Sequence, residues 1–325
     1  MTSMRELWFL APHDVVVRTG GVSSPLETGE VRARALASAI SQGTELLLYR
    51  GEGPTPFDPS LDSPGTPTYP RRYGYAWVGE VIESRAEGAP PGSRVFALAT
   101  HGDEHVLARN GLRFVPPSIA PERATLAANL ETALTVVWDA EIALGDDVVI
   151  LGGGIVGLLC GFLARASGAA RIRLVEPSAR RREAALALGM DEALSPEEDQ
   201  PNGRADVVIE ATGTPTCLDQ AILHAGQDAT VVVASFYGER KSAVALGQAF
   251  HRRRIQLKSS QVSRLPPKKT ARWDAARRFD LVLRWLADSR LDALLDRPIS
   301  FDEAPRAYAM LAANPGSSLQ VVFHY

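Results

Sequence analysis

The chain has 325 residues, enough for two ordinary domains, and its 45% hydrophobic and 22% charged residues are typical of a globular protein. Its formal net charge of -3 argues against a nucleic-acid partner, which would require a strongly basic surface. The two cysteines, Cys160 and Cys217, are too few for a disulfide framework or for a cysteine-rich zinc site.

The sequence predicts no targeting or membrane segment. The first ten residues contain one arginine and too short an apolar run for a signal peptide. The longest apolar stretch, 148–163, is interrupted by glycines and is shorter than the ~20 residues of a membrane span. We therefore expect a cytoplasmic protein that acts on a small-molecule substrate and binds neither membranes nor nucleic acid.

The first third of the chain predicts short strands between turns. Short β-branched runs alternate there with glycine and proline, over 15–17, 29–39 and 77–82. Residues 53–70 form a long loop rich in proline, serine, threonine and aspartate. Loops of this length in compact domains are usually functional, so we expect this one to cover the substrate.

From about residue 120 the pattern changes to strands that alternate with helices. This alternation predicts a parallel sheet wrapped by helices. The predicted strands are 147–151, 171–176, 206–211 and 230–236, and the predicted helices are 157–167, 180–188 and 218–225. The C-terminal part adds predicted helices over 274–286 and 302–313 and a predicted strand over 319–324.

A G-x-G-x-x-G motif lies where a predicted strand ends and a predicted helix begins. Its members are Gly152, Gly153, Gly154, Ile155, Val156 and Gly157. In a dinucleotide site Gly152 allows the tight turn, Gly154 lets the backbone approach the pyrophosphate, and Gly157 lets the helix pack closely on the strand. The free N–H groups at the start of the helix then bind the pyrophosphate.

The second predicted strand of this region ends in Glu176. A carboxylate at this place accepts hydrogen bonds from the adenosine ribose and repels a 2′-phosphate, which favours NAD. Ser178 and Arg181 follow in the sequence and could bind a 2′-phosphate, so NADP is the alternative cofactor.

Segments along the whole chain resemble the medium-chain dehydrogenase/reductase superfamily, the zinc-type alcohol dehydrogenase-like proteins. DVVIEATGTP (206–215) resembles its segment that contacts the cofactor ribose, and VVVASFYG (231–238) resembles its strand and loop beside the nicotinamide. Residues 301–325 resemble its C-terminal helix and strand. The resemblance implies cofactor contacts from Ala211, Thr212, Gly213, Ser235, Phe236 and Tyr237.

The resemblance also implies a domain organisation. We expect an α/β protein with a doubly wound parallel Rossmann domain over 123–262. A discontinuous, mostly antiparallel β domain of the GroES-like type would comprise 1–122 and 263–325, and active sites of this architecture lie in the cleft between domains. A homodimer is implied through the edge of the cofactor-domain sheet, with 241–246 as the expected contributor.

The segments that carry the catalytic zinc in this superfamily have changed. SQGTELLLYRG (41–51) resembles the segment with the zinc cysteine, but Ser41 or Gln42 stands at the cysteine position. RYGYAWVGEVIE (72–83) resembles the segment that contains Gly-His-Glu, which here is Gly-Tyr-Ala centred on Tyr75. The S-x-G-T-E pattern is similar to a zinc-free subgroup that contains the bacteriochlorophyllide a dehydrogenase.

We predict that the chain binds no metal. Glu131 remains in the third ligand region, but a catalytic zinc needs about three protein ligands. His101 and His105 have an i,i+4 spacing that would suit a helix, yet the surrounding sequence resembles a strand-and-turn passage of the superfamily.

Without zinc, a hydrogen-bond donor has to polarise the substrate oxygen. The candidates are Tyr75 at the histidine position, Thr44 where the superfamily places the hydroxyl of a proton relay, and Ser41. Glu131 is a candidate general base if burial raises its pKa. The structural alternatives are that Tyr75 fills the space of the metal, that Thr44 caps a helix and that Glu131 makes a structural hydrogen bond.

Three functions are compatible with these residues. The first is interconversion of an alcohol and a ketone of a small or ring-bearing metabolite, in a specialised biosynthetic pathway. The second is NADPH-dependent reduction of an activated C=C bond, as in enoyl and quinone reductases, and the third is dinucleotide binding without turnover. The aromatic residues expected at the substrate are Tyr49, Phe57, Tyr69, Trp77 and Trp273.

Overall fold

The computed structural model describes residues 4–21, 24–52, 69–238 and 240–325. The predicted substrate loop, up to residue 68, and Phe57 therefore lie outside the described residues. Contacts divide the chain into two compact units, Met1–Ala128 with Leu283–Tyr325, and Asn129–Val282.

These limits differ from the predicted domain boundaries, because 263–282 groups with the second unit. Arg278 forms an ion pair with Glu131, at 2.9 Å, and the rings of Trp273 and Trp138 pack with centroids 4.8 Å apart. Both contacts tie this stretch to the helix that opens the second unit.

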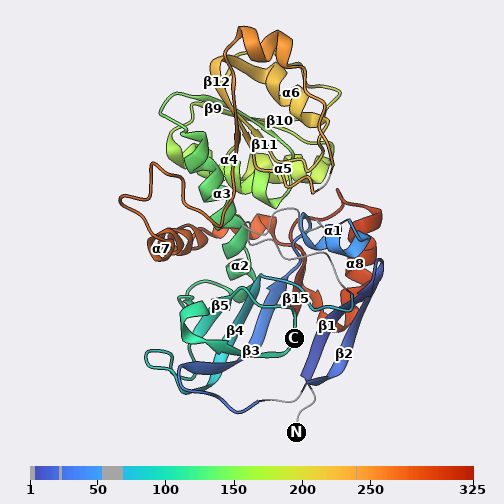
Figure 1. Ribbon diagram of the computed structural model, residues 1–325, viewed down its shortest axis with the longest axis vertical. Helices are drawn as coiled ribbons and strands as arrows, with labels where there is room; N and C mark the ends of the chain where they lie inside the picture. The colour runs from blue at the N-terminus through green and yellow to red at the C-terminus, as the bar shows by residue number, and fades with distance from the viewer. Residues whose placement is uncertain (1–3, 22–23, 53–68, 239) are drawn as a thin grey trace. The chain divides into compact units, whose positions relative to one another are not determined.

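The unit Asn129–Val282 is built on a six-stranded parallel sheet in the order β10-β9-β8-β11-β12-β13 (Figure 1). Counted from β8, this is the strand order 3-2-1-4-5-6 of a Rossmann fold. The strands are β8 (Asp147–Leu151), β9 (Arg171–Val175), β10 (Glu192–Leu194), β11 (Ala205–Glu210), β12 (Ala225–Val233) and β13 (Gln256–Ser259).

Helices cover this sheet, and the apolar runs of its central strands are therefore buried. The helices that contact its strands are α4 (Ile155–Ser167), α5 (Ala179–Ala187) and α6 (Cys217–His224). Helices α3 (Ala127–Ala140) and α7 (Ala275–Leu286) lie at the two ends of this unit in the sequence. None of the helices in the described part of the chain combines the length and apolar character needed to cross a membrane.

The other unit contains a seven-stranded, mostly antiparallel sheet in the order β14-β15-β3-β4-β5-β7, with β6 also paired to β3. The last strand pairs with β3, so distant parts of the chain complete one sheet. The strands are β3 (Glu30–Ala39), β4 (Trp77–Ser84), β5 (Arg94–Ala97), β6 (Glu104–Ala108), β7 (Arg113–Phe114), β14 (Ile299–Ser300) and β15 (Val322–His324).

The strands β1 (Met4–Ala11) and β2 (Asp14–Gly21) form a separate antiparallel pair. The described part of this unit includes the helices α1 (Glu45–Arg50), α2 (Pro121–Ala124) and α8 (Ala304–Ala313). Helix α8 lies against α1 and β2, and Phe9, Tyr308 and Phe323 form the centre of their common core. Leu46, Leu48 and Tyr49 of α1 belong to the same core.

One predicted strand and one predicted dimer segment differ from the structure. Strand β12 covers Ala225–Val233 instead of 230–236, since it already pairs at Ala225 with the start of β11 and leaves the sheet after Val233. Residues 241–245 belong to no strand, and the outer strand on that side of the sheet is β13. The predicted dimer segment 241–246 is therefore not part of the sheet edge.

Candidate active site

The glycine-rich turn connects β8 to α4. Gly152 has a φ of 96°, and a Cβ built on it would lie 2.7 Å from the carbonyl oxygen of Ala211. A Cβ on Gly157 would lie 2.0 Å from the carbonyl oxygen of Gly152. Gly154 precedes Ile155 at the start of α4 and has open space at its Cβ position. The geometry thus fits a pyrophosphate at the N-terminus of α4.

Glu176 directly follows β9, and its side chain is hydrogen-bonded to the glycine-rich turn. Its side chain is buried, with 4% of the residue exposed. One carboxylate oxygen accepts the N–H of Gly153 at 2.6 Å, and the other accepts the N–H of Ser178 at 2.9 Å. Each oxygen has a further lone pair, so the carboxylate can also accept ribose hydroxyls.

The basic residues after Glu176 lie in α5. Arg182 donates from Nη1 to the carbonyl oxygens of Glu176 and Pro177, both at 2.8 Å. Arg181 lies in the first turn of α5, and its role at the cofactor stays a prediction.

A second buried carboxylate, Glu210, ends β11. It accepts the N–H of Thr212 at 2.8 Å, the Thr212 hydroxyl at 2.5 Å and the hydroxyl of Tyr237. Burial, together with the Glu210 carboxylate, raises the pKa of Tyr237 well above its usual value. Ser235 accepts the N–H of Gly213 at 2.8 Å, which joins the segments after β11 and β12.

The segments 211–213 and 235–237 thus lie together at the carboxyl end of the sheet. The side chain of Phe236, in the second segment, is 53% exposed. Ligands of open α/β sheets bind at this edge. Glu210 was not among the residues predicted for the site, although it carries the same signal as Glu176, an acid at the end of a buried strand.

Three predicted hydroxyls meet in the other unit. Ala39 at the end of β3 donates its N–H to the carbonyl of Ala76 at 2.9 Å, and this strand pairing brings Ser41 next to Tyr75. The hydroxyls of Ser41 and Tyr75 are hydrogen-bonded, and the Thr44 side chain lies close enough to lower the pKa of Tyr75.

The environment keeps the Tyr75 phenol neutral near pH 7. Burial raises its pKa, while the hydrogen bonds from Ser41 and Thr44 act in the opposite direction. Thr44 is at the N-cap position of α1 but makes no side-chain capping hydrogen bond. The structure therefore does not favour the interpretation of Thr44 as a helix cap.

Glu131 lies in the unit Asn129–Val282. Its carboxylate accepts from Arg278, which is buried and also donates to the Thr135 hydroxyl at 3.1 Å and to the Val262 carbonyl at 2.8 Å. This network joins α3 to α7, so the geometry favours the structural alternative for Glu131 over general-base catalysis.

The described residues do not fit a catalytic zinc. Both ring nitrogens of His101 are hydrogen-bonded, to Ser38 and Glu45, and His105 contacts the Thr100 carbonyl at 2.8 Å from β6. Among the residues that the structure describes, no three or more His, Cys, Asp or Glu side chains form a group that could hold a metal. Gln42 donates instead to the carbonyl of Leu319.

The aromatic residues expected at the substrate have structural contacts. Trp77 is fully buried and donates to the Gly102 carbonyl at 3.0 Å, and Tyr49 stacks on Tyr308. Tyr69 donates to the Leu48 carbonyl, and Trp273 packs on Trp138. Core packing explains Trp77 and Tyr49 without a substrate role.

Residues 156–279 match the family described as zinc-binding dehydrogenase. The chain is also 30% identical over 243 residues to the 2-desacetyl-2-hydroxyethyl bacteriochlorophyllide A dehydrogenase of Cereibacter sphaeroides, across 70% of this chain and 72% of that relative. The chain belongs to the medium-chain dehydrogenase/reductase superfamily.

Other members agree with this assignment over longer alignments. The D-guloside 3-dehydrogenase of Escherichia coli K12 is 25% identical over 307 residues, 86% of this chain and 88% of that protein. A crystal structure of a Sinorhizobium meliloti protein bound to NADP has the same fold, with a TM-score of 0.81, 22% identity and complete coverage of both chains. This medium-chain dehydrogenase is thus an NAD(P)-dependent oxidoreductase with Rossmann and GroES-like domains.

Proposed function

We propose that this medium-chain dehydrogenase interconverts an alcohol and a ketone without zinc, through the hydroxyls of Ser41, Thr44 and Tyr75. The observation that carries the proposal is the hydrogen bond between Ser41 and Tyr75, in the two segments that hold zinc ligands in the superfamily. The relatives are named as dehydrogenases, which supports alcohol oxidation over C=C reduction.

The nicotinamide, when bound, accepts or donates the hydride. During reduction the Tyr75 phenol gives its proton to the ketone oxygen as the hydride is transferred, and a solvent proton passed through Ser41 or Thr44 restores the phenol. Oxidation runs the same proton path in reverse, with Tyr75 deprotonated through Ser41 or Thr44 before it takes the alcohol proton. Ser41 holds the phenol oxygen in place through its hydrogen bond, and Thr44 acts on the same phenol from nearby. General acid–base assistance of this kind contributes about 10²- to 10⁴-fold to a rate.

NAD is the proposed cofactor, because Glu176 presents a buried carboxylate beside the glycine-rich turn. A 2′-phosphate there would face a negative charge. The proposed substrate is a small or ring-bearing metabolite of a specialised biosynthetic pathway.

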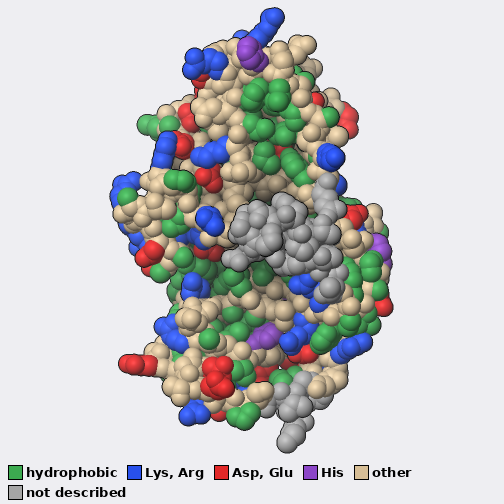
Figure 2. All heavy atoms as spheres, in the orientation of Figure 1, with side chains coloured by type: hydrophobic (Ala, Val, Ile, Leu, Met, Phe, Trp, Pro, Cys, Tyr) green, Lys and Arg blue, Asp and Glu red, His purple; other side chains and the backbone are tan. Residues whose placement is uncertain are grey.

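We also propose a homodimer formed through β13. Among the residues that the structure describes, this strand pairs only with β12, and an unpaired strand edge favours pairing with a second chain. Leu257 on this strand is 41% exposed. Figure 2 shows further apolar side chains gathered over α6 in the same unit. Light scattering of the purified protein tests the dimer.

One experiment tests the proposed chemistry. The purified protein, analysed for metals, is titrated with NADH and NADPH by fluorescence and then assayed with secondary alcohols, ketones and enones. We expect tighter NADH binding, ketone reduction and no stoichiometric zinc. One zinc per chain, or preferred reduction of enones with NADPH, would refute the proposal.

A further inference from the structure

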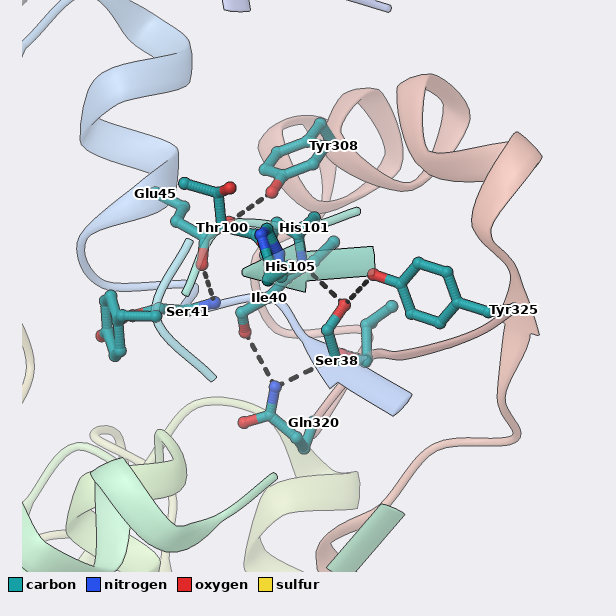
Figure 3. A network of polar contacts seen from close by, with 12 residues as sticks. Ser38, Ile40, Ser41, Glu45, Thr100, His101, His105, Tyr308, Gln320 and Tyr325 are labelled. Carbon is teal, nitrogen blue, oxygen red and sulfur yellow. Dashed lines mark hydrogen bonds and ion pairs between the residues drawn. The ribbon is translucent and has the colours of Figure 1, made fainter. Parts of the chain in front are cut away.

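A buried carboxylate, Glu45, is hydrogen-bonded to the backbone of Ser41, the residue whose hydroxyl bonds Tyr75 (Figure 3). Glu45 is the first residue of α1 and has no exposed surface. Its Oε1 accepts the N–H of Ser41 at 2.8 Å, and its Oε2 accepts from His101 Nε2 at 3.0 Å and from the Tyr308 hydroxyl. A buried carboxylate is costly without donors, so these contacts fix its position.

Glu45 holds the backbone of Ser41 from both sides. The Glu45 N–H donates to the Ser41 carbonyl at 2.8 Å, while the Ser41 N–H donates to the Glu45 carboxylate at 2.8 Å. Both polar backbone atoms of Ser41 are therefore bonded to one residue. This arrangement sets the point from which the Ser41 hydroxyl reaches Tyr75.

His101 supports Tyr75 as well as Ser41. It bonds Glu45, and its ring lies against Gly74, the residue before Tyr75. A Cβ on Gly74 would lie 2.8 Å from His101 Cδ2 and 2.9 Å from Nε2, and Gly74 has a φ of 129°. The same ring thus contacts the backbone of the Tyr75 segment and the carboxylate that holds Ser41.

The second ring nitrogen of His101, Nδ1, fixes the orientation of the ring. Nδ1 lies 2.7 Å from the Ser38 hydroxyl, which lies 2.6 Å from the Tyr325 hydroxyl. When Nε2–H donates to Glu45, Nδ1 accepts from Ser38 and Ser38 accepts from Tyr325, so every bond in this chain has a donor. Ser38 and His101 are fully buried. Such a satisfied buried network specifies one geometry.

We infer that Glu45 and His101 are positioning residues that hold the Ser41 and Tyr75 hydroxyls together for catalysis. The inference rests on the proposed function of these two hydroxyls. A displacement of about 1 Å in a catalytic group can lower a rate about 10²-fold, which is why such support matters.

The test uses the full chain and four variants. His101→Gln and Glu45→Gln remove the two positioning side chains, and Ser38→Ala is a milder change that frees only the His101 ring. His224→Gln is the matched control, since His224 is a second buried histidine that bonds a carboxylate, Asp199 at 2.8 Å, in the other unit.

The first measurement needs no substrate. The protein is labelled with 3-fluorotyrosine, and the ¹⁹F resonance of Tyr75 is assigned by its loss in Tyr75→Phe. We expect it to shift or broaden in His101→Gln and Glu45→Gln, to shift less in Ser38→Ala, and to stay unchanged in His224→Gln. An unchanged Tyr75 resonance in folded His101→Gln or Ser38→Ala protein would overturn the inference.

The second measurement uses the alcohol of the assay panel that the native protein oxidises fastest. We expect kcat to fall 10- to 100-fold in His101→Gln, with NADH affinity within twofold of native. The double variant His101→Gln/Tyr75→Phe should have the same kcat as Tyr75→Phe alone, because both changes remove the same function. Losses that multiply would overturn the inference. A shifted resonance in a protein that oxidises no alcohol would refute only the proposed function.

Discussion

Two buried glutamates end strands on either side of β8 and share one local arrangement. Glu176 and Glu210 each accept the N–H of the residue two positions later, at 2.9 and 2.8 Å. They differ in their second contact, which is the Gly153 N–H for Glu176 and the Tyr237 hydroxyl for Glu210. Since only Glu176 bonds the glycine-rich turn, it is the residue expected to set cofactor preference.

Replacement of this carboxylate should alter cofactor choice. In Glu176→Ala we expect the NADH dissociation constant to rise about tenfold or more, as a lost hydrogen bond to a charged group costs about 1.5–3 kcal/mol. NADPH binding should change less. Fluorescence titration measures both, with Glu192→Gln on the next strand as the control. An equal loss for both cofactors would contradict the ribose role.

The variant Tyr75→Phe distinguishes a catalytic role of Tyr75 from a role in filling the space of the metal, because it removes only the hydroxyl. We expect kcat to fall about 10²- to 10⁴-fold, with NADH affinity unchanged. Tyr73→Phe is the matched control, since the Tyr73 ring packs edge-on against Tyr75 with centroids 6.4 Å apart. Native kcat in Tyr75→Phe would mean that the side chain only fills the site.

At the scale of elements, the sequence predicted features that depend on local patterns. The apolar run of β8 and the glycine spacing after it indicated the strand and the turn, and the structure has both at these residues. Partners distant in sequence were missed. Ser38 and Tyr325 are 287 positions apart, and the sequence predictions gave no role to Glu45, the first residue of α1.

The glycine-rich turn offers a test of two neighbouring glycines. Gly157→Ala should lower stability by about 1–3 kcal/mol, because its Cβ would overlap the Gly152 carbonyl. Gly154→Ala should leave stability nearly unchanged, since its Cβ position is open, yet weaken NADH binding through a methyl group at the pyrophosphate. Thermal unfolding and NADH titration measure the two effects. Equal unfolding temperatures in the two variants would contradict this assignment.

At the scale of the whole molecule, one unit is continuous in sequence and the other is assembled from two segments. Two histidines, one in each unit, have pKa values lowered by burial, His224 and His105. Asp199, Asp147 and Arg173 are the charged groups that act on His224. Acid should therefore destabilise each unit through its own histidine.

The sign of this effect follows from proton uptake. The unfolded chain protonates His224 near the ordinary histidine pKa of 6.5, and the folded chain does so only at lower pH. Stability should thus fall as pH drops below about 6.5. Thermal unfolding between pH 5 and 8 should show a weaker pH dependence in His224→Gln than in the native protein. The same slope in both would contradict a contribution from His224.

The pairing of β15 with β3 has a consequence for synthesis on the ribosome. The residues of β3 are made long before their partner, Val322–His324. At about 5–20 residues per second, the Rossmann unit is finished several seconds before this strand exists. During synthesis the Rossmann unit should therefore be folded while the β3 edge at Ala37–Ala39 is still unpaired. A chain truncated before β15 should therefore keep the folded Rossmann unit and its dinucleotide site. Its β3 edge would stay unpaired, and the Ser41, Thr44 and Tyr75 hydroxyls would not be held in place.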